Sequence, residues 1–292
     1  MTPALDPSSA EHRPTGDPTD AASAPDSGGP SAPGAFDLPL QPLGWRDPFR
    51  WLALGWRDFR RCPGIGLFYG TAFAVMGGLL MKVFAAAPAY TLALSAGFLL
   101  MGPFLCMGLY DASARLERGE RPDLGRSLLI WTERLGALAI FCVVLLVLEM
   151  LWARASLVIF AVSFDRVPDF HGSLLRLVSL ENAGFIAVYL AVGGVFAALI
   201  YGVSVVSIPM ILDRGTDAIG SGLMSLRLVL AQPGVMLLWA ALLALAVFAA
   251  MLPAFLGLLV VAPVLGHASW HAYRAAVGPA PSAVPVGADA PG

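Results

Sequence analysis

Two histidines near the end of the chain, His267 and His271, are four residues apart. On a helix this spacing puts both side chains on one face, about one turn from each other, where they could supply two ligands to a metal ion. Asp111 and Asp217 are the carboxylates that could complete such a site. The pattern raises the hypothesis of a metal site; the sequence predicts no other cofactor.

The same histidines also fit a second interpretation. Trp270, Tyr273 and Arg274 surround His271. Aromatic and basic side chains gather where a membrane helix meets the lipid headgroups. An interfacial cap is therefore the simpler interpretation, with the metal site as its alternative.

Two further ionisable residues, Glu149 and Arg154, lie in or near an apolar run that opens at Leu135. An ionisable group at membrane depth is costly and is a functional hypothesis by default. The pair predicts an intramembrane polar site that could handle a substrate or protons. The alternative is structural pairing, with Arg154 extending its side chain to the headgroups.

Three prolines occupy equivalent places, because Pro103, Pro209 and Pro263 each lie near the end of an apolar run. The residues eight positions after them are Asp111, Asp217 and His271. If the three segments pack around a common axis, these polar groups gather at one end of the bundle. Asp213 and Arg214 close the second segment, and we expect Asp213 to offset Arg214 or Arg227 at the inner face of the membrane.

Composition identifies the elements that must position these residues. Of the 292 residues, 58% are hydrophobic and 13% are charged, about half the charge of a soluble domain. The 18 basic residues are balanced by 20 acidic ones, so the chain lacks the basic excess of nucleic-acid-binding proteins. This excludes nucleic acid as a partner. These proportions are typical of an integral membrane protein.

Apolar runs long enough to cross a bilayer cover residues 65–87, 89–110, 135–164 and 183–212. A fifth run, residues 235–265, has 31 residues without a charge and carries Pro253 in its middle. It is either a hairpin of two short helices or one kinked span. The repeat favours the hairpin, because an amphipathic stretch precedes each pair of runs, at residues 51–61, 124–134 and 219–230.

The predicted fold is an all-α polytopic membrane helix bundle. It has six transmembrane helices arranged as three helix pairs, each preceded by an amphipathic interfacial helix. The membrane domain covers residues 45–275. Residues 1–44, rich in Pro, Ala and Ser and acidic, predict a disordered cytoplasmic tail, and residues 276–292 a disordered C-terminal tail.

Orientation follows from the basic residues near the span ends. With six spans, fourteen Arg lie on the side of the N-terminus, and only Lys82, Arg154, Arg166 and Arg176 lie on the other. Both termini are therefore expected in the cytoplasm. The Arg clusters on that side predict contact with anionic lipids of the inner leaflet.

Several short motifs resemble a known family over residues 45–275. They are Trp51-Leu52-x-Leu54-Gly55-Trp56-Arg57-Asp58, Gly97-Phe98-Leu99-Leu100-x-Gly102-Pro103, Ser207-Ile208-Pro209-Met210-x-Leu212-Asp213-Arg214 and Pro263-x-Leu265-Gly266-His267-Ala268-x-Trp270-His271. In this order they resemble the bacterial predicted integral membrane proteins of domain-of-unknown-function family 2189. The resemblance implies a multi-pass protein of the bacterial inner membrane and no established activity.

Function is predicted only by class. The sequence has no phosphate-binding loop, no dinucleotide fingerprint and no Ser or Cys nucleophile beside a plausible base, so we do not expect an enzyme. An accessory or scaffold component of a membrane complex is the first hypothesis, with another membrane protein or a second copy as partner. The alternative is a transporter or channel for small molecules or ions, and a metal-binding membrane enzyme comes last.

Overall fold

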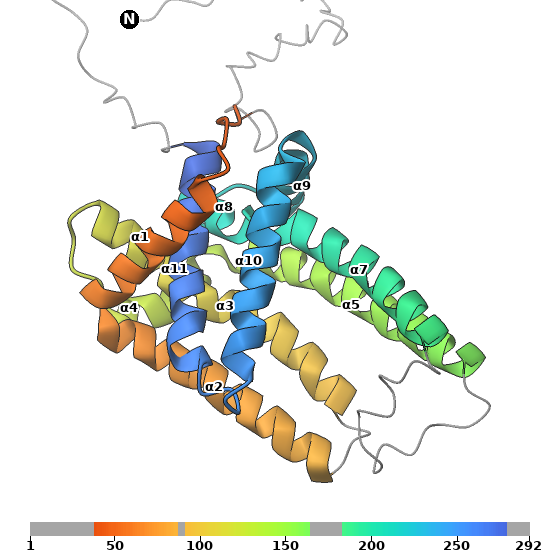
Figure 1. Cartoon of the computed structure of the whole chain (residues 1–292). Coiled ribbons are helices and arrows are strands. Elements are labelled where there is room, and N and C mark those ends of the chain that lie inside the picture. Colours follow the sequence, from red (N-terminus) through yellow and green to blue (C-terminus); the bar gives the residue numbers. More distant parts are fainter. Residues whose placement is uncertain (1–37, 87–90, 164–182, 279–292) are drawn as a thin grey trace, which may run out of the picture. The chain divides into compact units, whose positions relative to one another are not determined.

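The computed structural model describes residues 38–86, 91–163 and 183–278, and this part of the chain is all helical (Figure 1). The helices are α1 (Asp47–Arg61), α2 (Pro63–Ala86), α3 (Thr91–Glu117), α4 (Leu124–Leu129), η3 (Ile130–Arg134), α5 (Leu135–Ser163), α7 (Ala183–Ser204), α8 (Ser207–Arg214), α9 (Ala218–Ala231), α10 (Pro233–Met251) and α11 (Leu258–Val277). The η3 segment is a short 3-10 helix that continues α4.

The long helices form three pairs, α2 with α3, α5 with α7, and α10 with α11. A short helix precedes each pair, namely α1, α4 with η3, and α9. Two of the short helices pack against the second helix of the pair that precedes them. These are α4, which packs against α3, and α9, which packs against α7 and also contacts α8. The first short helix, α1, packs against α11 of the last pair. The three repeats therefore close into a ring.

The short helices begin where the sequence offers a cap. The carboxylate of Asp123 accepts the N–H of Arg126 at the start of α4, and that of Asp217 accepts the N–H of Gly220 at the start of α9. The α8 helix ends at Gly215, whose φ of 64° is the left-handed conformation that glycine adopts readily. Local capping thus separates the interfacial helices from their neighbours.

Among the described residues, four helical stretches are long and apolar enough to cross a membrane: Pro63–Val83, Leu124–Ser163, Ala183–Arg214 and Pro233–Met251. Two of the six expected membrane spans, α3 and α11, are not among these four stretches. In α11 only residues 258–266 form an uninterrupted apolar stretch, about half of the 20 residues that a span needs.

Two of the predicted runs differ in detail. Residues 235–265 form two helices joined by a turn at residues 252–257, so the hairpin is confirmed as a local structure. The apolar run of residues 183–212 predicts one helix, but the structure has two, because α7 ends at Ser204 and α8 begins at Ser207. The cause is Pro209, because a proline has no N–H to continue the helix, and in the first turn of α8 that loss costs nothing.

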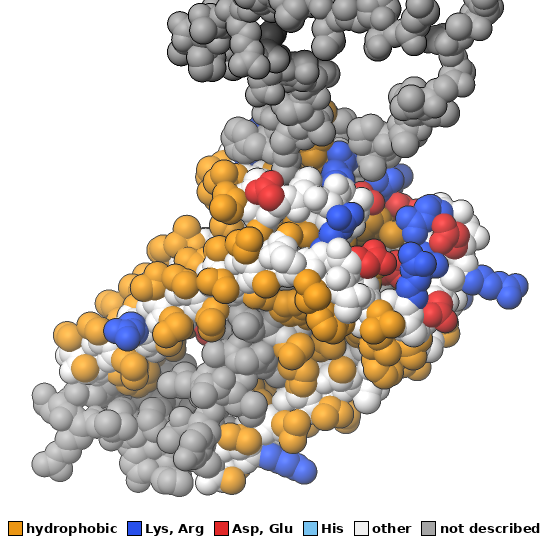
Figure 2. Space-filling view, turned by 180° about the vertical axis from the view of Figure 1, so that it is seen from behind, with side chains coloured by type: hydrophobic (Ala, Val, Ile, Leu, Met, Phe, Trp, Pro, Cys, Tyr) orange, Lys and Arg blue, Asp and Glu red, His pale blue; other side chains and the backbone are white. Residues whose placement is uncertain are grey.

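The main core is formed by side chains of α1, α5, α8, α9 and α10 together with the C-terminal halves of α3 and α11. Its largest fully buried side chains include Trp51, Met107, Met210, Trp239 and Tyr273. On the face shown in Figure 2, most charged side chains gather at one end, whereas hydrophobic side chains cover most of the remainder of the described residues. Much of the buried core therefore lies at the same end of the helix pairs as the charged surface. We call this the polar end; it comprises α1, α8 and the C-terminal halves of α3 and α11.

Close packing around α11 depends on two glycines. A Cβ at Gly55 of α1 would lie 2.5 Å from the carbonyl oxygen of Val264. Gly70 of α2 lies directly against the carbonyl of Leu259. That carbonyl has no helical partner, because the residue four positions later is Pro263, which has no N–H. Glycine at both places lets α1 and α2 approach the backbone of α11.

The predicted tails lie mostly outside the described residues, so their expected disorder stays a prediction. Residues 38–44, at the end of the predicted N-terminal tail, make hydrogen bonds with the bundle. The N–H of Gln41 donates to the carbonyl of Ala276, and the N–H of Leu43 donates to the side chain of Gln232.

Candidate functional site at the polar end of the helix pairs

A buried hydrogen-bonded network links α1, α3 and α11. The imidazole Nε2 of His271 lies 2.7 Å from Oδ2 of Asp58, and the hydroxyl of Ser113 donates to the same oxygen at 3.1 Å. The residues are 6%, 1% and 0% exposed, respectively. Because a carboxylate only accepts hydrogen bonds, His271 carries its hydrogen on Nε2.

His267 extends this network one turn earlier on α11. Its Nδ1 lies 2.8 Å from the Ser113 hydroxyl oxygen, whose own hydrogen is donated to Asp58. The hydrogen-bond pattern therefore assigns the imidazole hydrogen to Nδ1 of His267. The opposite nitrogen, Nε2, faces the thiol of Cys62 at 4.0 Å. The Cys62 thiol donates instead to the backbone carbonyl of Asp58, at 3.2 Å. Asp58, Ser113 and His267 thus form one continuous chain of donors and acceptors.

Burial acts differently on two of these groups. For Asp58, burial alone would raise the pKa of the carboxyl, but the hydrogen bond and charge of His271, with the hydrogen bond from Ser113, hold that pKa below its ordinary 3.8. For Cys62, burial and the neighbouring charge of Asp58 raise the pKa of the thiol to about 11. The acid is therefore ionised and the thiol protonated at neutral pH.

A second chain of polar contacts runs from α11 to α8. Arg274 lies with Nε 3.1 Å from Glu117 and Nη1 3.6 Å from Asp213. The hydroxyl of Tyr273 donates to Asp213 at 2.7 Å and accepts from Arg214 at 3.0 Å. Of the two expected partners of Asp213, Arg214 is reached through a bridging tyrosine and not directly, because adjacent helical residues point in different directions.

Arg214 also closes the end of α11. Its Nη2 donates to the carbonyls of Val277 at 3.2 Å and Gly278 at 2.8 Å. The last carbonyls of a helix have no helical partner, and a guanidinium is a suitable donor for them. Arg214 therefore fixes the C-terminal end of α11 to α8.

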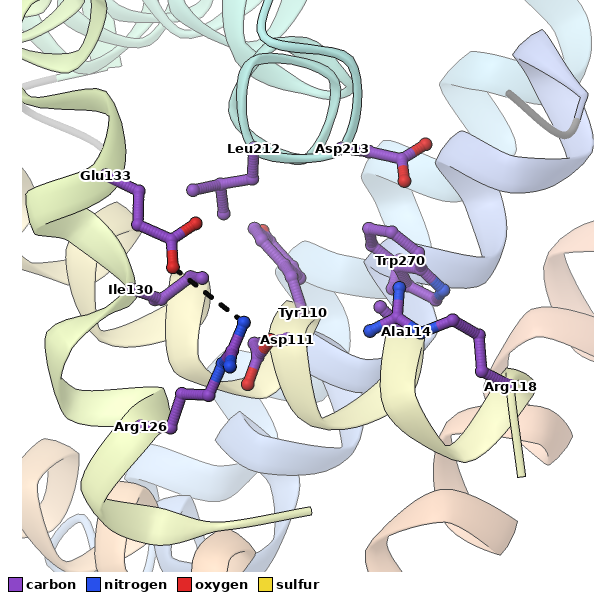
Figure 3. Close-up of a pocket in the computed structure, with 10 residues that line it drawn as sticks. All are labelled: Tyr110, Asp111, Ala114, Arg118, Arg126, Ile130, Glu133, Leu212, Asp213 and Trp270. Atoms are coloured by element: carbon purple, nitrogen blue, oxygen red, sulfur yellow. Dashed lines mark ion pairs between the residues drawn. The ribbon is translucent and has the colours of Figure 1, made fainter. Parts of the chain in front are cut away.

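A pocket of about 160 Å³ opens where the three repeats meet (Figure 3). Its lining includes Asp111 of α3, Glu133 of η3, Asp213 of α8 and Trp270 of α11. Arg126 enters from α4 and lies 3.9 Å from Glu133. The segments that follow the three prolines thus contribute side chains to one pocket.

A larger pocket of about 350 Å³ lies between α1, α3 and α11. It is lined by Asp47, Arg50, Trp51, Leu54, Glu117, His271, Arg274 and Ala275. The volume is within the range of small-molecule sites. His271 therefore links this pocket to the buried carboxylate of Asp58.

The predicted metal ligands are placed in different surroundings. His267 and His271 contact Ser113 and Asp58, as described above. Asp111 lies 3.0 Å from Arg115, and Asp217 caps α9. No group of three or more His, Cys, Asp or Glu among the described residues has a geometry that could hold a metal ion. The metal site stays a prediction, and the observed contacts of the four residues do not support it.

Glu149 and Arg154 lie on α5, away from the polar end. Neither side chain makes a hydrogen bond or ion pair with another described residue. Glu149 is half-buried and Arg154 is exposed. The structure therefore does not bring these two groups to the histidines.

Sequence reasoning missed Asp58, Ser113 and Glu117 as partners of the histidines. One signal for Asp58 was present, because it lies in helical register with Trp51 and Gly55 on the buried stripe of α1. A carboxylate on an apolar stripe requires a buried donor. Ser113 and Glu117 carry no comparable local signal.

Comparison with known proteins adds the family. Residues 91–213 match the model of the family described as predicted integral membrane protein (DUF2189). This part of the chain belongs to the DUF2189 family. The match covers α3, α4, η3, α5, α7 and all but the last residue of α8, so the family segment includes both Ser113 and Asp213. No curated protein and no solved structure matches the chain significantly. The protein is an integral, multi-pass membrane protein in contact with the lipid bilayer.

Proposed function

We propose that the chain is a six-span protein of the bacterial inner membrane that serves as an accessory or scaffold component of a membrane complex. The three helix pairs supply the six spans, and both termini lie in the cytoplasm. The polar end, with α1 and its Arg residues, then faces the cytoplasm, as the bias of basic residues requires.

The observation that supports this role is the exposure of the α5 and α7 pair. In the most apolar 18-residue stretch of Ala183–Arg214 no residue is buried, against a third in the corresponding stretch of α2. The outer half of the pair is held by its own aromatic contacts, such as Trp152 with Tyr189 and Phe160 with Phe185. The pair therefore presents apolar surface that other membrane helices can cover.

Glu149 strengthens the argument. It is the fifteenth of the 29 residues of α5, so it lies near the middle of that span. A charged side chain at this depth costs roughly 3 kcal/mol on insertion scales. With no partner among the described residues, its carboxyl would be satisfied by a polar side chain of an adjoining protein.

Site-specific photocrosslinking in cells tests the proposal. A photoreactive residue at Val158 of α5 or Leu190 of α7, which are 61% and 66% exposed, should give a protein adduct of discrete mass. The matched control is Val75 of α2, 55% exposed, which should give no such adduct. Adducts at Val75 as strong as those on α5 and α7, or none at any position, would contradict the role.

Transport is the second candidate, and the same carboxyl favours it, since intramembrane acids serve proton and ion pathways. The two roles differ in the effect of Glu149→Gln. If the chain is a scaffold, Glu149→Gln should weaken crosslinking at Val158. If the chain is a transporter, the same variant should leave the adducts unchanged and abolish uptake of the transported solute.

The topology has its own test. A reporter that is active only in the periplasm should be silent when fused after Gly278, and a cytoplasmic reporter should work there. A strong periplasmic signal would reject the six-span arrangement.

A further inference from the structure

Arginine side chains form a stripe along the exposed half of α1. With about 100° between successive helical residues, four of them fall within about 60° of one another: Arg46, Arg50, Arg57 and Arg61. The carbonyl of Arg46 accepts the N–H of Arg50, so the helical register already includes the residue before Asp47. All four side chains are exposed. We call these four residues the arginine stripe.

Aromatic side chains lie along the same exposed half, beside the arginine stripe. Phe49 and Trp56 are two helical turns apart, are 54% and 46% exposed, and lie about 100° around the helix from the arginines. Trp45, just before the helix, is 65% exposed. The opposite side of α1, with Gly55 and Asp58, packs against α11. The arginine and aromatic side chains are therefore on the part of α1 that the bundle leaves uncovered.

The positive charge of the arginine stripe is not offset within the described part of the chain. The guanidinium groups of Arg46, Arg50 and Arg61 make no hydrogen bond or ion pair with another described residue. Nε of Arg57 lies 3.7 Å from Oδ1 of Asp58, which is longer than a hydrogen bond. These guanidinium groups therefore keep their N–H donors for a partner outside the protein.

The arginines at the end of α3 differ in this respect. Nε of Arg115 lies 3.0 Å from Asp111. Nε of Arg118 lies 2.9 Å from Glu120. Of the two arginine clusters at the polar end, the one on α1 therefore carries the positive charge that is free to attract an anionic surface.

The connection between α1 and α2 determines the depth of the arginine stripe. One residue separates Arg61 from Pro63, where a stretch long and apolar enough to cross a membrane begins. Arg57 lies six residues before Pro63, about 9 Å along a helix. The headgroup layer on each side of the hydrocarbon core is about 5–8 Å thick. The C-terminal end of α1 is therefore near the lipid phosphates.

The aromatic side chains extend this placement along the helix. Exposed aromatic side chains on an amphipathic helix lie at the boundary between headgroups and acyl chains. Phe49 lies near the start of α1 and Trp56 lies in its second half. Both ends of α1 are therefore suited to the same depth, with the helix along the membrane surface.

We propose that the exposed face of α1 is a docking surface for anionic phospholipids, which bind with their phosphates on the arginine stripe. A guanidinium binds phosphate oxygens through paired N–H donors. The aromatic side chains favour a lipid over a soluble phosphate, because they need the edge of the acyl chains. This surface is independent of the proposed scaffold role, since it uses no residue of α5 or α7.

Lipid binding to the purified, delipidated chain in detergent tests the proposal. Native mass spectrometry counts bound lipids as dioleoyl-phosphatidylglycerol or dioleoyl-phosphatidylethanolamine is added. The two probes share the acyl chains and the phosphate, but the ammonium of the second offsets its charge. We expect phosphatidylglycerol to bind at least about fivefold more tightly, the effect of one arginine near an anionic lipid surface.

A double variant and a matched control locate the surface. Arg50→Gln with Arg61→Gln should weaken binding of phosphatidylglycerol at least about tenfold, since two of the four charges are lost. Neither guanidinium contacts another described residue, so the unfolding temperature should be unchanged. Arg118→Gln with Arg126→Gln removes two exposed arginines that face acids, and should bind as the native chain does.

Soluble competitors distinguish the lipid from other anions. Glycerol 3-phosphate and a hexaglutamate peptide should leave binding of phosphatidylglycerol unchanged. Competition by the first would assign the arginine stripe to soluble phosphates, and competition by the second would assign it to an acidic protein segment. Either result, equal affinity for the two lipids, or equal losses in the double variant and its control would overturn the proposal.

Discussion

The polar end and the α5 and α7 pair are built in opposite ways. At the polar end, α1, α3, α8 and α11 bury ionisable groups and satisfy them with each other, as Asp58, Ser113 and His271 do. In the outer half of α5 and α7, aromatic contacts join only two helices, and Glu149 has no partner among the described residues. The first region is a packed core in which most buried polar groups are paired, with Oδ1 of Asp58 and Nε1 of Trp270 as exceptions, whereas the second is an exposed apolar surface.

The difference is physical. A buried network is stable only when each group finds a partner, so it needs several helices at once. A lipid-facing pair needs only apolar side chains, because the bilayer provides no hydrophobic drive to bring further helices together.

The largest expected effect separates the two regions directly. Asp58→Ala removes the acceptor of His271 and Ser113 and should lower the free energy of unfolding by about 3–5 kcal/mol, the cost of breaking a buried pair. Glu149→Ala on α5 breaks no contact within the chain and should leave stability unchanged or raised. Thermal unfolding of both variants in detergent measures this. Equal losses would remove the distinction between the regions.

Helix contact distances provide the second comparison. Gly55→Ala puts a Cβ 2.5 Å from the carbonyl oxygen of Val264 and should destabilise the chain by about 1–3 kcal/mol through overpacking. Gly194→Ala on α7 meets nothing within 4 Å and should instead stabilise the helix by about 0.5–1 kcal/mol. The sign of the two shifts in unfolding temperature is the readout. A stabilising Gly55→Ala would show that α1 does not press against α11.

A smaller loss is expected at the junction of α8 and α11. Tyr273→Phe removes the hydroxyl that bridges Asp213 and Arg214 and should cost about 1 kcal/mol, since both partners are only partly buried and water can replace it. Chemical denaturation of the variant gives the value. Tyr201→Phe, which removes a hydroxyl bonded to the Met236 carbonyl, is the control for a bond outside this network. An Asp213→Ala, Tyr273→Phe double variant should lose less than the sum of the single losses, because the residues interact.

The last effect is on the pH dependence of stability. The pKa of Asp58 is held below 3.8 in the folded chain, so its contribution is fully present above the unfolded value and is lost as pH falls through the lower folded value. Stability of the native chain should therefore fall when the pH drops below about 4. Asp58→Asn should show a shallower fall over the same range, measured by unfolding temperature against pH. An identical slope would show that other carboxylates carry the acid sensitivity.

Much of the architecture was predictable from the sequence because it depends on local properties. The apolar runs marked α2, α5 and α10, and the three amphipathic stretches became α1, α4 with η3, and α9. The hairpin of α10 and α11 followed from aligning Pro263 with Pro103 and Pro209. These features depend on run length, periodicity and the missing N–H of proline, all of which act within a few residues.

The partners of the polar residues were not predictable in the same way. His267 and His271 were correctly placed on one helix face, but their contacts with Ser113, Asp58 and Glu117 join residues 154, 213 and 154 positions apart. The separation of Asp213 from Arg214 by a bridging Tyr273 likewise depends on how α8 meets α11.

The sequence by itself determined a multi-pass helical membrane protein with three similar helix pairs, because hydrophobic length and spacing are encoded residue by residue. Only the tertiary structure decided that α1 packs against α11. This packing brings Asp58 to His271 and forms the pocket between α1, α3 and α11. That contact depends on Gly55 meeting Val264 and Ala268 across more than two hundred residues. No local pattern specifies such a meeting, because it is selected by the joint packing of all the helices.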